Sequence, residues 1–180
     1  MIKQLKRQCL LALLLLLAID LFILHLTTAS FSTIGTHLSR RLGHNIEIIK
    51  QLEWDELIFI LYRDQLTNQL DIAWYKPNAL LFWRYSFEGE HKATAHAHVN
   101  RCQTYQTNHY FIVWGENENL RASTLELILN QEIFIEDLSN DNYFLYVYDL
   151  NGVYPETIYC TFYNQQSDNI SPYFFESFLK

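Results

Sequence analysis

The chain has 180 residues and a formal net charge of −7, with 16% aromatic residues but only five glycines and three prolines. Ten Lys or Arg and nineteen Asp or Glu follow residue 29, which gives this part a formal charge of −9. The acidity argues against a nucleic-acid partner, because phosphate backbones bind basic surfaces. The scarcity of Gly and Pro argues against long flexible linkers.

Residues 9–26 (CLLALLLLLAIDLFILHL) form an apolar run that predicts a transmembrane helix. At the rise of an α-helix this run spans about 27 Å, close to the thickness of a bilayer core. The preceding tail, residues 1–8, carries Lys3, Lys6 and Arg7, which favours a cytoplasmic N-terminus. We therefore expect a single-pass cell-membrane protein, with the lipid bilayer as a partner and the C-terminal domain extracytoplasmic.

Two features of this segment allow other interpretations. Asp20 and His25 are ionisable groups in an apolar run. They would contact a partner helix in the membrane, or else His25 lies at the membrane interface and Asp20 is merely tolerated. Thr27 and Ala29 place small residues before a cleavage site after Ala29, and such cleavage would release a secreted effector. The apolar run is longer than that of an ordinary signal peptide, which favours an uncleaved signal anchor.

Residues 27–44 are predicted to form a stalk that contains a short helix over residues 32–42. Ile34, Leu38 and Leu42 recur every four residues and share one helical face, and Gly43 is a suitable C-terminal stop. We expect this helix to continue the anchor outward.

Residues 45–170 show the period-2 alternation and the turn residues of an antiparallel β domain, so the expected fold is mostly β, a β-sandwich or meander. The predicted strands are 46–52, 56–62, 70–75, 80–85, 93–99, 110–114, 124–129, 132–135, 143–148 and 157–163. Residues 57–62 are apolar on both faces, which predicts a central strand covered on both sides. Asn130 and Gln131 predict a tight hairpin.

Aromatic side chains supply two candidate partner-binding surfaces. One consists of tyrosines expected on exposed strand faces: Tyr146, Tyr148, Tyr159 and Tyr163. They would stack on a sugar or peptide, or else form cross-strand pairs that stabilise the sheet. The other surface is the C-terminal tail, residues 171–180, with Phe174, Phe175 and Phe178. The tail would either pack back on its own domain or act as a docking peptide.

A His-rich segment suggests a metal site as an alternative to a chain without cofactors. His96 and His98 would share one face of a strand and offer two imidazoles to zinc, with Cys102 or His109 as a third ligand. The competing interpretation is that these are solvated strand histidines. Cys102 and Cys160 would form a disulfide in an oxidising compartment, or Cys160 would be a small buried thiol.

Sequence patterns of catalysis are absent: the chain has no G-x-S-x-G, H-E-x-x-H, Walker A or G-x-G-x-x-G motif, so we do not expect an enzyme. Residues 55–86 and 111–129 resemble a group of uncharacterised single-pass proteins of Gram-positive bacteria, each with one helix and a small extracytoplasmic β domain. The resemblance implies this topology and no activity.

These observations favour a membrane-anchored module that binds or scaffolds an envelope protein or glycan. The alternatives are a metal-binding or metal-sensing membrane protein and a secreted effector.

Overall fold

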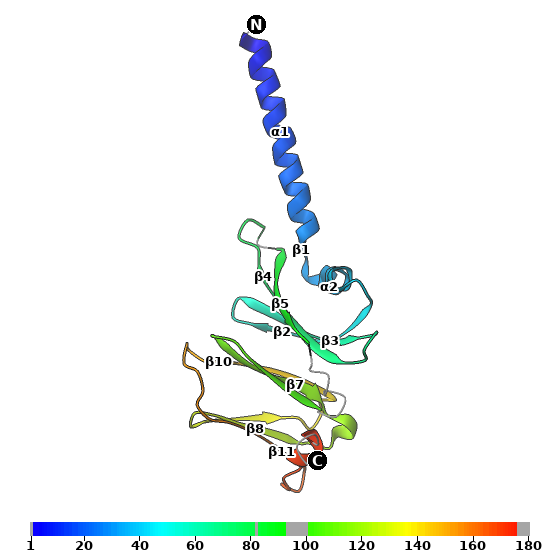
Figure 1. Ribbon diagram of the computed structural model, residues 1–180, viewed down its shortest axis with the longest axis vertical. Coiled ribbons are helices and arrows are strands. Elements are labelled where there is room, and N and C mark those ends of the chain that lie inside the picture. Colours follow the sequence, from blue (N-terminus) through cyan, green and yellow to red (C-terminus); the bar gives the residue numbers. More distant parts are fainter. Residues whose placement is uncertain (1, 82, 93–100, 176–180) are drawn as a thin grey trace.

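A computed structural model describes residues 2–81, 83–92 and 101–175 (Figure 1). The chain begins with one long helix, α1 (Ile2–Thr27), which projects away from a β-rich body. The segment Leu10–Thr27 is long and apolar enough to span a membrane, and none of it is buried against the rest of the protein. An apolar helix without protein cover is typical of a segment solvated by lipid.

The strands form three antiparallel sheets, which we name by their distance from α1 (Figure 1). The proximal sheet has the order β1-β5-β4-β3-β2 and comprises β1 (Thr28–Ala29), β2 (Ile46–Trp54), β3 (Leu57–Asp64), β4 (Leu70–Pro77) and β5 (Tyr85–His91). The middle sheet has the order β10-β7-β6 and comprises β6 (Cys102–Gln106), β7 (Tyr110–Glu116) and β10 (Tyr143–Asp149). The distal sheet has the order β11-β8-β9 and comprises β8 (Thr124–Leu129), β9 (Glu132–Asp137) and β11 (Ile158–Tyr163).

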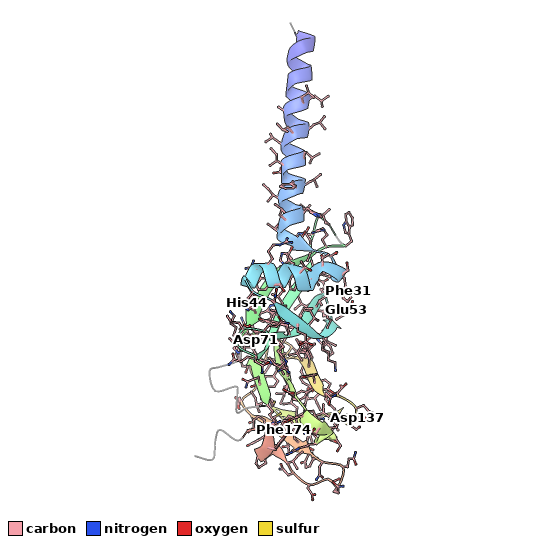
Figure 2. The ribbon with its side chains drawn as sticks, turned by 90° about the vertical axis from the view of Figure 1, so that its right-hand side faces the viewer. Phe31, His44, Glu53, Asp71, Asp137 and Phe174 are labelled. Carbon is pink, nitrogen blue, oxygen red and sulfur yellow. The ribbon has the colours of Figure 1, made fainter. Side chains whose placement is uncertain are left out.

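Short helices cover the two ends of this stack. They are η1 (Phe31–Thr33), α2 (Ile34–Leu42), η2 (Glu118–Leu120) and α3 (Ser171–Phe174). The helix α2 lies across the direction of α1 and packs on the proximal sheet, with Ile34 and Leu38 fully buried (Figure 2). It ends as predicted at Gly43, whose φ of 79° is left-handed and whose N–H donates to Ser39 O at 3.0 Å. The expected outward stalk is wrong, because the apolar stripe of this helix is buried against the sheet.

Three apolar layers hold the stack together. One lies between α2 and the proximal sheet, one between the proximal and middle sheets, and one between the middle and distal sheets. The proximal and middle sheets are therefore covered on both faces. This explains the continuous apolar runs of β3 and of β7, whose Ile112 and Trp114 face the proximal sheet while Phe111 and Val113 face the distal one.

The predicted fold class, mostly β with antiparallel sheets after an apolar helix, is confirmed. β8 has the predicted bounds, and the Asn130–Gln131 turn joins it to β9 with Leu129 opposite Glu132. The predicted strand 80–85 is wrong. There Asn78 Oδ1 accepts the backbone N–H groups of Leu80 and Leu81, each at 3.0 Å, and holds a loop. β1, β6 and all of β5 after Tyr85 were not predicted, and the predicted strand 93–99 lies outside the described residues.

Candidate functional site

The distal sheet has one buried face and one open face. Leu125, Leu127 and Leu129 of β8 point into the apolar layer beneath the middle sheet. The opposite side chains of the sheet form the open face, where Ile128 of β8 lies between Tyr159 of β11 and Ile133 of β9. Alternation along each strand separates the two sets.

Three large side chains on this open face are exposed to an unusual degree. Ile133 is 61% exposed, Ile135 68% and Tyr159 60%. Exposed apolar residues are common singly, but neighbouring ones on one sheet face indicate an interaction surface. Two of the three belong to β9, which is therefore the centre of the candidate site.

β9 is an edge strand. It pairs with β8 alone among the described residues, so its outer edge offers backbone N–H and C=O groups without a strand partner. Its sequence, EIFIED, places three consecutive apolar residues between acids: Glu132, Glu136 and Asp137. Such acids discourage two edges of the same kind from pairing, because like charges would lie opposite one another.

A groove of about 510 Å³ runs along this edge between β9, β10 and β2. Its aromatic walls include Trp54, Phe134 and Tyr146. Glu132, Glu136 and Asp149 also line it. Lys50 is the one cation among its described lining residues, and its Nζ lies 3.0 Å from Asp141 Oδ2. The groove is therefore apolar and acidic, a combination suited to a partner that carries both apolar and basic side chains.

Two tyrosines of β10 join the middle sheet to β9 beneath the groove. Tyr148 Oη donates to Glu136 Oε1 at 3.1 Å, and Tyr146 Oη donates to the Asp137 carbonyl at 3.3 Å. Burial, together with the neighbouring Glu136 carboxylate, raises the pKa of Tyr146 to about 12 and raises that of Tyr148 as well. Both phenols therefore stay protonated as donors, and they hold β9 in place.

The predicted partner-binding tyrosines are divided between two environments. Tyr146 is half-buried and Tyr148 is 5% exposed, so the expected exposure of Tyr148 is wrong. The reason is that the distal sheet covers the face of β10 that looked open from its alternation. Tyr159 and Tyr163 do lie on the open face of the distal sheet, where Tyr163 is half-buried.

The aromatic tail packs back on the domain as far as the structure describes it. Phe174 is fully buried and stacks on Phe162 with ring centroids 3.8 Å apart, and Phe175 is half-buried beside it. Phe174 therefore cannot serve as a docking side chain. Phe178 lies outside the described residues.

The predicted metal ligands are not brought together in the described part of the chain. Cys102 is buried opposite Gly115 at one end of the β6–β7 hairpin, and His109 lies in the turn at its other end. Residues 2–81, 83–92 and 101–175 contain no group of three or more His, Cys, Asp or Glu that could hold a metal ion. His96 and His98 lie outside the described residues, so the zinc alternative stays a prediction.

Cys102 and Cys160 are free thiols that face each other between the middle and distal sheets. Burial, and then the adjacent Cys160 thiol, raises the pKa of Cys102. Cys102 is buried and Cys160 is half-buried, and the predicted pairing stays a prediction.

Sequence reasoning missed Ile133 and Ile135. A signal was present, because Ile133, Phe134 and Ile135 place apolar side chains on both faces of a six-residue strand between acids. No protein-family model, curated protein or solved structure matches this chain. The resemblance to Gram-positive single-pass proteins stays a prediction.

Proposed function

We propose that this protein is a membrane-anchored module that binds an extended, basic and apolar segment of another protein along the edge of β9. The observation that carries the proposal is the exposure of Ile133 and Ile135 on an edge strand flanked by acids. A partner segment in extended conformation would continue the distal sheet, and its backbone would pair with the free edge. Its side chains would lie partly on the open face and partly in the groove.

The charge of the site favours a basic partner over a second copy of this chain. Two β9 strands paired antiparallel would bring Glu132 of one copy toward Glu136 and Asp137 of the other. A segment that alternates Lys or Arg with apolar residues would meet these carboxylates with opposite charge. We infer that the partner is a different protein.

The helix α1 would hold this site at a fixed distance from a bilayer. The basic residues before the apolar segment favour a cytoplasmic N-terminus, which would place the three sheets on the extracytoplasmic side. The distal sheet is the layer farthest from α1 (Figure 1), and in this orientation it would face away from the membrane.

The proposal is tested by selecting peptides that bind to the full-length protein, which is held in lipid nanodiscs. A displayed library of random peptides is expected to yield binders that alternate Lys or Arg with apolar residues. The double variant Ile133→Thr, Ile135→Thr keeps β propensity but removes the apolar surface, so we expect affinity to fall at least about tenfold. Glu132→Lys is expected to weaken the same peptides through charge repulsion.

Leu66→Thr is the matched control, because Leu66 is also strongly exposed but lies in the turn between β3 and β4. This variant should retain full binding. Selected peptides that bind both β9 variants as well as the original chain would contradict the proposal, as would a selection dominated by acidic peptides.

A further inference from the structure

A second hollow is lined by residues of α1, of α2 and of the segments that join them to the proximal sheet. The junction of α1 with the body lies far from the distal sheet (Figure 1). The hollow has a volume of about 330 Å³ and is lined by two arginines, two histidines and four side-chain hydroxyl groups. Its described lining residues include no carboxylate. The pocket is therefore locally basic, although the domain as a whole carries more acidic than basic residues.

Helix α2 supplies one wall of this junction pocket through its spacing. Thr36 and Arg40 lie on the exposed face of the helix, away from the stripe that buries Ile34 and Leu38, and the half-buried His37 lies at the edge between the two faces. Arg40 is exposed. His37 Nδ1 lies 3.0 Å from Tyr75 Oη, and burial, with Arg41 and Arg40 nearby, lowers the pKa of His37. The two arginines carry a positive charge that does not depend on this titration.

Arg84 forms the other wall and is held against the end of α1. Its Nε donates to Thr28 Oγ1 at 2.5 Å, and its Nη2 donates to the carbonyls of His25 (2.8 Å) and Thr28. A guanidinium at this position stabilises the negative end of the helix dipole. The Nη1 group has no partner among the described residues, so the arginine still has donors to offer to a ligand.

The chemistry of the pocket fits a phosphate group. Planar guanidinium groups bind phosphate oxygens through charge-assisted hydrogen bonds. The hydroxyl groups of Thr28 and Thr33 already donate to backbone carbonyls, so the exposed Thr36 is the hydroxyl best placed to add a donor. The pocket begins at the last turn of α1, the level at which lipid headgroups lie if Leu10–Thr27 spans the bilayer. The source of phosphate nearest to this position is a membrane lipid.

Exposed apolar side chains surround the same junction. Leu80 (79% exposed) and Trp83 (56%) belong to the loop between β4 and β5, which reaches the level of the last turn of α1 (Figure 1). Phe31 is exposed beside the start of α2 (Figure 2). Aromatic and aliphatic groups at this level are typical of a surface that contacts the bilayer interface.

We propose that the junction pocket binds the phosphate group of an anionic membrane lipid through Arg40 and Arg84. The lipid would seat the domain against the membrane and fix its orientation relative to α1. This inference rests on the proposed membrane insertion of α1. It is independent of what binds to β9.

The test uses the full-length protein in mixed vesicles of phosphatidylglycerol and phosphatidylcholine. After gentle extraction in detergent, we expect phosphatidylglycerol to be retained over phosphatidylcholine. Arg40→Gln should reduce this enrichment about tenfold, because Arg40 is exposed and makes no hydrogen bond or ion pair with another described residue. Arg84→Gln should also reduce it, but this side chain also holds α1. The control is Arg121→Gln, which removes the same charge between η2 and the distal sheet and should leave the enrichment unchanged.

Two further measurements separate the ways in which the inference can fail. Inorganic phosphate is titrated into the detergent-solubilised protein, and binding that depends on Arg40 without lipid enrichment would overturn the lipid in favour of free phosphate. Equal retention of both lipids, or unchanged enrichment in Arg40→Gln, would overturn the pocket itself. If alkaline carbonate removes the protein from the vesicles, α1 is not inserted in the membrane. Both the membrane-anchored module and the lipid site would then be contradicted.

Discussion

Gly115→Ala is expected to abolish stable folding or to lower the free energy of unfolding by at least about 3 kcal/mol. Gly115 lies on β7, the central strand of the middle sheet, opposite Cys102 on one side and Phe144 on the other. A Cβ at this position would overlap the Arg101 carbonyl oxygen and would lie 2.6 Å from Phe144 Cζ. Backbone on one side and a fully buried ring on the other leave little room for relaxation.

Urea unfolding of the full-length chain in non-ionic detergent, followed by near-ultraviolet circular dichroism, measures this effect. Gly152→Ala is the matched control. Gly152 lies in a turn with a φ of 75°, and a Cβ added there would meet no described atom within 4 Å, so its substitution should cost only about 1 kcal/mol of backbone strain. Equal losses in the two variants would contradict the tight packing of the middle sheet.

Oxidation of Cys102 and Cys160 to a disulfide is expected to stabilise the domain by up to about 4 kcal/mol, from the entropy of closing a long loop in the unfolded chain. The two thiols lie on β6 and β11 and interact with each other within the apolar layer between the middle and distal sheets. Because burial raises the pKa of Cys102, little thiolate forms in the folded state. We therefore expect the bond to form during folding in an oxidising compartment.

A Cys9→Ser background isolates this pair. The expected result is that protein from the membrane of intact cells reacts with maleimide, after denaturation, only if it is first reduced. Reduction should also lower its free energy of unfolding. The additional variant Cys102→Ala should be insensitive to reductant, which separates loss of the bond from other effects of the reagent. Two thiols reactive without reduction would contradict both the disulfide and the proposed extracytoplasmic location.

Some features of the β9 site could be predicted from the sequence and others could not. The strand β9 could be predicted, since an Asn130–Gln131 turn follows the alternating run of β8. Its position at the edge of a sheet could not, because edges are defined by which strands pair. Tyr148 shows the same limit: its alternation with Val147 indicates two faces of a strand, but nothing local indicates that other sheets cover both.

The sequence by itself determined the features that depend on neighbouring residues. An apolar run long enough for a bilayer, a glycine stop at Gly43, the β8–β9 hairpin and a β3 strand apolar on both faces follow from helix length, backbone freedom and periodicity. Only the tertiary structure decided the order of the layers, the packing of α2 on the proximal sheet, and the hydrogen bonds of Arg84 to the end of α1. These depend on contacts between residues far apart in the chain, and the competing packings differ in long-range burial rather than in local preference.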